Sequence, residues 1–279
     1  MLKQITYSIF LFVLYCSGVS AETYDLAATM IFRDEAPYLK EWIEYHKLLG
    51  VQHFYLYNNL SEDNYLEVLD PYIRSGEVDL VQWPYDSKSN EKWDIIQRKA
   101  YDHSLKRAKK STRWLAIIDS DEFLVPAKEN NLVDFLKSYE KKGVGGVRGY
   151  WVFFGTSFVE KIPEEQLLVE TLILNGAGHH LSKSIVRPRF VTNCLVHKCN
   201  YVKGYHHIQL LLSEMQINHY WSRDEYYLYN YKIPRRKKWN TSDETCILWG
   251  TRHNSHTPYS ETILRFVEPL RSLMGLPNE

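Results

Sequence analysis

The chain has 279 residues, of which 44% are hydrophobic and 24% are charged, a composition typical of globular proteins. Its length allows one large domain or two small ones. Because 34 basic residues balance 34 acidic ones, no net positive field favours nucleic acid or an anionic membrane, and we expect no nucleic-acid partner.

The first 21 residues differ from the rest of the chain. Lys3 precedes an apolar stretch over residues 5–15, and the small residues Val19, Ser20 and Ala21 resemble a signal cleavage site. The apolar stretch is shorter than the roughly 20 residues that span a bilayer. The sequence therefore predicts a cleaved secretory signal, with an uncleaved signal anchor and membrane attachment as the alternative. The expected location is the secretory pathway: the Golgi or endoplasmic reticulum in a eukaryote, the exterior or the membrane in a bacterium.

Secretion would also determine whether the cysteines can form disulfides. If Cys16 leaves with the signal, Cys194, Cys199 and Cys246 remain. An oxidising compartment permits disulfides, but the odd number leaves one thiol or an intermolecular bond. Asn59 and Asn240 head two glycosylation sequons, which matter only if the organism glycosylates secreted proteins.

From residue 26 onward, strand-like and helix-like segments alternate. Their order predicts βαβ units with right-handed crossovers and a mostly parallel sheet. Strands are predicted at residues 26–32, 51–57, 77–82 and 114–118, and helices at residues 37–50, 65–76 and 93–109. After residue 150 this rhythm degrades. Aromatic residues at 151–154 follow several glycines, and residues 183–188 predict one further strand that enters a loop.

Two acidic residues, Asp119 and Asp121, follow the apolar run at residues 114–118. Mg²⁺ and Mn²⁺ prefer oxygen ligands, and Mg²⁺ is typically held by one or two carboxylates together with substrate phosphates. Ligands of parallel sheets bind beyond the carboxyl ends of the strands, where Arg33, Asp34 and Asn58 are also predicted to lie. The sequence therefore predicts a metal-assisted nucleotide site at this edge of the sheet.

Several segments, in order along the chain, resemble glycosyltransferase family 92, a group of inverting sugar transferases of the GT-A type that includes galactosyltransferases. The segments are residues 32–42, 57–63, 114–123, 151–157, 183–188, 196–197 and 218–220. The related family-2 transferases share the first half and remain an alternative. Asp224 departs from the serine usual in the family, and residues 232–236 replace a Lys-Arg-Gly-like ending.

The resemblance implies an α/β fold of the GT-A nucleotide-diphospho-sugar transferase type, with a Rossmann-like, mostly parallel sheet and a mixed acceptor-side half. We expect one domain over residues 22–279, with the nucleotide-binding half at 22–125 and the acceptor-side half at 126–279. The implied reaction is the metal-dependent, inverting transfer of a hexose, with galactose as one candidate. The donor would be a nucleotide-diphosphate sugar such as a UDP-hexose, and the acceptor a glycan. The competing hypothesis is a secreted carbohydrate-binding protein on an inactive GT-A scaffold.

The resemblance also implies a metal site for Mn²⁺ or Mg²⁺. Asp121 is the expected direct ligand, and Asp119 would face the ribose or a metal-bound water. His219 is the expected third ligand, because many GT-A enzymes use a late histidine, with His197 as the alternative.

Five further residues are predicted to bind the donor. Arg33 and Glu35 follow the first strand, and Asp63 follows the second, although a helix-start cluster or a turn would explain them equally well. Lys183 and Arg187 could supply positive charge to the diphosphate, with ordinary surface charge as the alternative.

Inversion needs a carboxylate that removes the proton of the acceptor hydroxyl. The candidates are Glu214 and Asp224, with Glu160 and Glu244 as alternatives. Trp151 and Trp221 are predicted to stack on the acceptor sugar, although core packing is an alternative for such aromatic residues.

Overall fold

A computed structural model describes residues 23–87, 89–176, 181–239, 241–242, 244–246, 248, 257–259 and 261–277. The predicted signal at residues 1–21, with Cys16, and the sequon residue Asn240 lie outside the described residues. Within the described part of the chain, no helix has the length and apolar character needed to cross a membrane.

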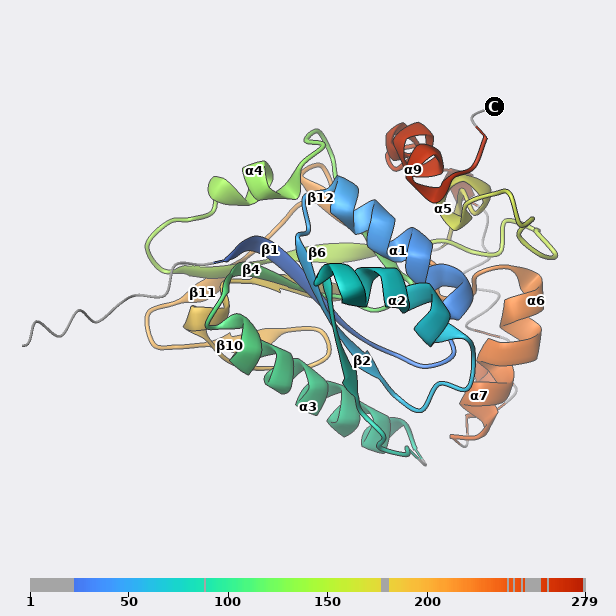
Figure 1. The fold of residues 1–279 in the computed structure, drawn as a ribbon, viewed down its shortest axis with the longest axis horizontal. Helices are drawn as coiled ribbons and strands as arrows, with labels where there is room; N and C mark the ends of the chain where they lie inside the picture. The colour runs from blue at the N-terminus through green and yellow to red at the C-terminus, as the bar shows by residue number, and fades with distance from the viewer. Residues whose placement is uncertain are drawn as a thin grey trace, which may run out of the picture.

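The first half of the chain alternates strands and helices as predicted, with shifts of a few residues at the ends (Figure 1). Its strands pair in parallel in the order β3-β2-β1-β4. The elements are β1 (Tyr24–Phe32), α1 (Ala36–Leu48), β2 (His53–Asn58), α2 (Tyr65–Ser75), β3 (Val78–Gln82), α3 (Asn90–Ala108) and β4 (Thr112–Ile117).

The second half extends the same sheet with strands of both directions. The order continues from β4 through β8, β6 and β12 to β5, and β11 pairs with β6. The strands are β5 (Glu122–Pro126), β6 (Val144–Phe153), β8 (Ser182–Val186), β11 (His206–Gln209) and β12 (Met215–His219). The α/β fold class, with a mostly parallel first part and a mixed second part, is thereby confirmed.

Shorter elements complete the second half. Two small antiparallel pairs, β10-β9 and β13-β7, lie outside the main sheet. The elements are α4 (Leu132–Lys137), α5 (Leu168–Thr171), β7 (Leu174–Asn175), β9 (Val191–Cys194), β10 (Cys199–Tyr201), α6 (Glu225–Tyr227), a π-helical turn (Leu228–Lys232), α7 (Ile233–Lys237), β13 (Thr257–Tyr259) and α9 (Val267–Met274). Cys194 and Cys199 form a disulfide between β9 and β10, and Cys246 is a buried thiol outside it.

Helices cover both faces of the sheet because side chains of a strand alternate between the faces. Leu26, Ala28 and Met30 of β1 belong to the apolar core that contains residues of α1 and α2. Ala27 and Ile31 belong to a second core that contains residues of α3. The helices therefore leave the edge beyond the strand ends open, and α6 and α7 lie together at one end of the sheet (Figure 1).

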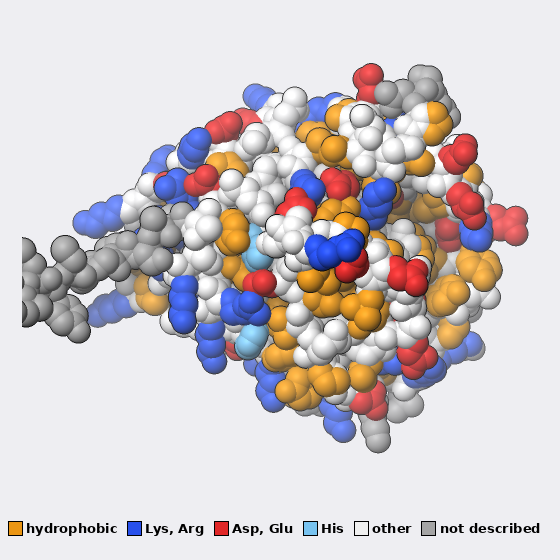
Figure 2. All heavy atoms as spheres, viewed as in Figure 1, with side chains coloured by type: hydrophobic (Ala, Val, Ile, Leu, Met, Phe, Trp, Pro, Cys, Tyr) orange, Lys and Arg blue, Asp and Glu red, His pale blue; other side chains and the backbone are white. Residues whose placement is uncertain are grey.

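Acidic and basic side chains are interspersed on the face of the molecule that Figure 2 shows, with apolar side chains between them. The view thus matches the balanced formal charge of the sequence.

A buried carboxylate joins the first helix to the second half of the chain. Glu41 of α1 accepts hydrogen bonds from the backbone N–H groups of Leu168 and Val169, at 2.9 and 3.1 Å. These groups lie in the first turn of α5, where backbone donors lack partners within the helix. Burial raises the pKa of Glu41 to about 7, although the two N–H donors oppose the shift.

Stability is expected to depend on pH through Glu41. Because its pKa rises from 4.5 in the unfolded chain to about 7 in the fold, its contribution is complete below pH 4.5 and is lost as the pH rises through 7. The shift corresponds to about 3 kcal/mol. Urea unfolding at several pH values should show that the difference between wild type and Glu41→Gln shrinks over this window. A difference that stays constant would contradict the assignment, and Glu164→Gln at an exposed site is the control.

Candidate functional site

Four strand ends meet at one edge of the sheet and open into a cavity of about 870 Å³. β8 is antiparallel to both β4 and β6, so β4 and β6 run in the same direction, and β12 is parallel to β6. The carboxyl ends of β1, β4, β6 and β12 therefore lie at the same edge. From these ends, Arg33, Asp119, Asp121, Trp151 and His219 line the cavity. Predicted residues that are far apart in the sequence are thus brought together.

Residues of α3 and β8 bind the side chain of Asp119. Its Oδ1 accepts hydrogen bonds from Gln97 and Tyr101 of α3, both at 2.9 Å. Its Oδ2 accepts from Lys183 Nζ at 2.7 Å. Lys183 is almost fully buried, also lies 3.6 Å from the carboxylate of Glu122, and is not among the described residues that line the cavity. Lys183 thus supports Asp119 from outside the described cavity lining, and its predicted contact with the diphosphate stays a prediction.

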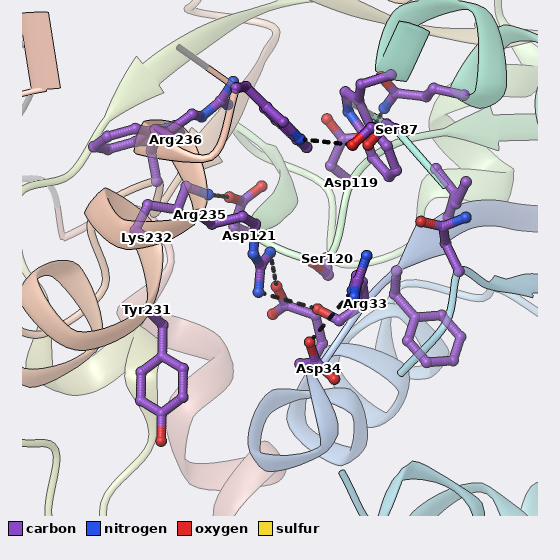
Figure 3. A pocket seen from close by; sticks show the side chains of 18 of the residues that line it. Arg33, Asp34, Ser87, Asp119, Ser120, Asp121, Tyr231, Lys232, Arg235 and Arg236 are labelled. Carbon is purple, nitrogen blue, oxygen red and sulfur yellow. Dashed lines mark hydrogen bonds and ion pairs between the residues drawn. The ribbon is translucent and has the colours of Figure 1, made fainter. Parts of the chain in front are cut away.

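Asp121 faces the cavity beside Lys232 (Figure 3), with His219 on its other side. His219 Nε2 lies 3.4 Å from Oδ1, and Lys232 Nζ lies 2.9 Å from Oδ2. Burial by itself would raise the pKa of Asp121, but Lys232 and His219 hold it well below the usual range. Burial lowers the pKa of His219, which favours the neutral imidazole that can coordinate a metal.

The donor atoms of Asp121 and His219 fit a divalent cation. Two ligand atoms about 2.1 Å from one metal ion stand roughly 3 Å apart when they are adjacent in its shell, close to the observed 3.4 Å. Among the described residues, one atom each of Asp121, Glu122 and His219 lie within 4.8 Å of one another. Glu122 is fully buried, and burial together with the charge of Asp119 raises its pKa well above the usual range, so that its neutral form is favoured.

The predicted metal set is thereby changed. Asp119 does not belong to the cluster that contains Asp121 and His219. Its two oxygens already accept hydrogen bonds from Gln97, Tyr101 and Lys183. Asp121 and His219 are the two cavity-facing donors, and Asp119 borders them. His197 also lines the cavity, and burial lowers its pKa to about 4, but it is not part of the cluster.

Trp42 of α1 positions the acidic loop from the core. The fully buried indole donates from Nε1 to the backbone carbonyls of Asp119 and Glu122, at 3.1 and 3.0 Å. These two carbonyls flank Asp121. The side chain thus fixes the backbone on both sides of the cavity-facing carboxylate.

Trp42→Phe is expected to weaken Mn²⁺ binding about tenfold, because loss of an outer-shell support typically costs 10- to 100-fold in metal affinity. Stability should also fall by about 1–3 kcal/mol, since the Glu122 carbonyl loses the indole donor and the Asp119 carbonyl keeps only the Glu122 N–H. Calorimetric titration with Mn²⁺ would measure the first effect. Trp114→Phe is the matched control: Trp114 is equally buried, but its indole donates to Glu140. Equal Mn²⁺ affinities in the two variants would contradict the role of Trp42.

A segment formed by residues 223–239, here called the closing segment, covers one side of the cavity (Figure 3). Glu35 anchors it. The Glu35 carboxylate accepts hydrogen bonds from Arg223 and from the hydroxyl of Tyr227, and Arg235 lies 3.8 Å away. Arg223 is fully buried, and its guanidinium stacks 3.5 Å from the ring centre of Tyr38. Glu35 borders the cavity as predicted, but both of its oxygens are engaged with this segment.

Aromatic side chains form the remaining walls. Trp151 and Trp221, both predicted to bind acceptor, line the cavity, and the Trp151 ring lies 4.2 Å from that of His219. Trp93 and Trp239 stack at 5.8 Å, and the Trp239 indole donates to the carbonyl of Ser87. This second pair joins the start of α3 to the closing segment.

Neither predicted base, Glu214 or Asp224, is among the described residues that line the cavity. Glu214 precedes β12, at the end of that strand opposite to His219. It accepts hydrogen bonds from Tyr139 and the Leu211 N–H, beside a separate cavity of about 330 Å³. Asp224 caps α6 by accepting from the Tyr227 N–H, because a helix start needs an acceptor. The alternatives Glu160 and Glu244 are also absent from the described lining of the cavity.

Two predicted donor-binding residues also lie elsewhere. Asp63 accepts a hydrogen bond at 2.7 Å from the Ala36 N–H at the start of α1, as the turn-residue alternative implied. Arg187 follows β8, which runs antiparallel to β4, and therefore lies at the opposite edge of the sheet. It donates to the carbonyl of Val144, the first residue of β6. Both residues are absent from the described cavity lining, and their donor contacts stay predictions.

The sequence predictions missed the basic side chains of the closing segment. Lys232, Arg235 and Arg236 line the cavity and are spaced three and four residues apart, on one side of a helical turn. The available signal was the cluster of basic residues at 232–238 after several tyrosines. Arg33 lines the cavity from the other side, with its guanidinium 3.6 Å from Asp34.

Sequence comparison identifies relatives over most of the chain. The profile of glycosyltransferase family 92 matches residues 27–262. A family 92 protein of Oryza sativa subsp. japonica is 32% identical over 205 residues, covering 71% of this chain and 33% of the relative. A galactan beta-1,4-galactosyltransferase of Arabidopsis thaliana is 30% identical over 143 residues, covering 47% of this chain and 27% of the relative. The chain spans about a third of the length of the family 92 relatives it matches.

Solved structures show a distant likeness. S. aureus TarS in complex with UDP is 13% identical, with a TM-score of 0.38 over 60% of this chain and 47% of that chain. Glucosyl-3-phosphoglycerate synthase from Mycobacterium tuberculosis is 15% identical, with a TM-score of 0.33 over 61% and 58%. The family profile, in contrast, runs from β1 through β13 and includes every strand of the main sheet beyond the first residues of β1. The chain therefore belongs to glycosyltransferase family 92.

Proposed function

We propose that this chain is a metal-dependent inverting glycosyltransferase that moves a hexose from a nucleotide-diphosphate sugar to a glycan. The observation that carries the proposal is the pairing of Asp121 with His219, 3.4 Å apart, at the edge where four strand ends open into one cavity. The cavity volume of about 870 Å³ falls within the 300–1,000 Å³ of small-molecule sites. Family membership and the galactosyltransferase relative support a sugar donor.

The charges around the cavity suit a nucleotide diphosphate. Asp121 and His219 would hold Mn²⁺ or Mg²⁺, which when bound acts as a Lewis acid that stabilises the charge developing on the leaving diphosphate. Lys232, Arg235 and Arg236 line the adjacent wall, where cationic side chains can bind phosphate oxygens. Arg33 lines the cavity at the end of β1, which supports the proposal that it contacts the nucleoside.

The acceptor side is formed by aromatic residues. Trp151 and Trp221 would orient a sugar ring against the donor, with both rings already fixed by burial. Asp86 and Asp94 also line the cavity. Because the earlier candidates Glu214 and Asp224 lie outside it, we propose that the base of an inverting transfer is one of these two carboxylates.

We further propose that the protein acts in the secretory pathway. We also propose that residues 22–279 form one domain. The disulfide between Cys194 and Cys199 supports this location, because disulfides persist in oxidising compartments. We propose UDP-hexoses as the donors, with galactose as the first sugar to test. We also propose that the N-terminal segment attaches the protein to a membrane.

A donor screen tests the proposed function. The purified chain, with its disulfide intact, is incubated with Mn²⁺, glycan acceptors and a panel of UDP- and GDP-sugars, and the released nucleoside diphosphate is measured. We expect release from a UDP-hexose and a product whose anomeric configuration, measured by NMR, is inverted. Glycan binding without release from any donor would instead support the carbohydrate-binding hypothesis.

A further inference from the structure

Lys232 forms an ion pair with Asp121, the carboxylate that we assign to the divalent cation. Its Nζ lies 2.9 Å from Oδ2 (Figure 3). His219 Nε2 lies 3.4 Å from Oδ1 of the same carboxylate. Both Lys232 and Asp121 are buried, with about a tenth of each side chain exposed. The ammonium therefore already neutralises the carboxylate that we assign to metal binding.

The surroundings of Lys232 make this pairing responsive to charge. Its Nζ also lies 5.0 Å from the ring centre of Trp221. A buried ammonium without an anionic partner is strongly unfavourable. If a divalent cation took the charge of Asp121, repulsion between the two cations would press Lys232 to find another anion.

The local backbone and side chain suit such a movement. Lys232 ends a π-helical turn, Leu228–Lys232, between α6 and α7; π-helical turns occur frequently at functional sites. Its four-carbon stem is flexible. The neighbouring Arg235, in contrast, lies beside Glu35 and donates to the carbonyl of Arg33. Lys232, unlike Arg235, thus has the metal-binding carboxylate itself as its described anionic partner.

We propose that Lys232 exchanges with the divalent cation at Asp121 and, once displaced, binds the diphosphate of the nucleotide sugar. This inference rests on the proposed function and adds a donor-positioning residue to it. Metal alone must displace the ammonium without giving it a new partner. Metal together with the donor supplies that partner, so the two ligands should bind cooperatively, with a coupling in the usual range of roughly 5- to 150-fold.

The test compares Lys232→Met with wild type in two calorimetric titrations. For Mn²⁺ alone, we expect the variant to bind about tenfold more tightly, because the competing charge is gone. For UDP at saturating Mn²⁺, we expect it to bind about tenfold more weakly, because a phosphate contact is gone. A general folding defect would weaken both Mn²⁺ binding and UDP binding. Lys237→Met, at an exposed position of the following helix α7 outside the described cavity lining, should match wild type in both titrations.

Equal or weaker Mn²⁺ binding by Lys232→Met, relative to wild type, would overturn the exchange. Unchanged UDP binding would overturn the second half of the proposal. If the methionine variant does not fold, Lys232→Gln removes the charge while keeping a donor toward Asp121, with the same expectations. A wild-type chain that binds no UDP in the presence of Mn²⁺ would instead overturn the proposed function, whichever way the Mn²⁺ affinities compare.

Discussion

Asp121→Asn is expected to lower the rate of sugar transfer at least about a thousandfold, which corresponds to roughly 4 kcal/mol of transition-state stabilisation. Asparagine keeps the size of the side chain but removes the charge that faces the cavity beside His219. A neutral amide is a poorer ligand for a hard divalent cation, so Mn²⁺ affinity should fall with the rate. Steady-state release of nucleoside diphosphate and Mn²⁺ titration calorimetry measure the two effects.

The control for this variant is Asp70→Asn. Asp70 lies on the exposed surface of α2 in an ion pair with Arg74, away from the cavity. Thermal unfolding of both variants separates a folding defect from a catalytic one. A rate for Asp121→Asn within about tenfold of wild type, at equal folded fraction, would show that the charge of Asp121 is not required.

Glu35→Ala is expected to destabilise the fold by about 3–5 kcal/mol, because it leaves the buried guanidinium of Arg223 without its carboxylate. The melting temperature should fall by about 10 °C. The variant also removes the acceptor of the Tyr227 hydroxyl and the anion beside Arg235. The closing segment should therefore loosen, with faster amide hydrogen exchange over residues 224–239.

The exchange measurement locates the effect of Glu35→Ala. Glu62→Ala, at an exposed position after β2, is the matched control and should leave both the melting temperature and the exchange of the closing segment unchanged. Glu35→Gln should fall between wild type and Glu35→Ala, since the amide oxygen still accepts one hydrogen bond. Destabilisation without faster exchange in the closing segment would contradict the anchoring role.

The parallel half of the fold could be predicted from the sequence because its signals are local. Apolar runs and helical spacing mark each element, and parallel strands place their carboxyl ends at one edge. That rule correctly brought Arg33 and Asp121 to the same cavity. The direction of each strand in the second half depends instead on pairing between residues that are distant in the sequence. The sequence of the predicted strand at 183–188 does not show that it runs antiparallel to β4, so it could not predict the edge of the sheet at which Arg187 lies.

The candidate site likewise contains residues that the sequence predicts and contacts that it does not show. Asp121 and His219 stand at strand ends, where the pattern and the family resemblance agree. The supports of the site are not visible in the sequence. The bonds from Trp42 to two backbone carbonyls, and from Lys183 to Asp119, join elements that only the folded sheet brings together. Lys232 was missed for a related reason: its partner Asp121 lies 111 residues earlier in the chain.

The most direct test of metal-dependent transfer in this cavity is a time course of hexose transfer from the donor that the screen identifies. Wild-type enzyme is assayed with Mn²⁺, with EDTA, and with Mn²⁺ restored in excess, alongside Asp121→Asn. We expect transfer with Mn²⁺, loss of transfer with EDTA, full recovery on restoration, and no recovery in the variant. Transfer that continues undiminished in EDTA, or that Asp121→Asn supports at the wild-type rate, would contradict the proposed role of Asp121 and its cation.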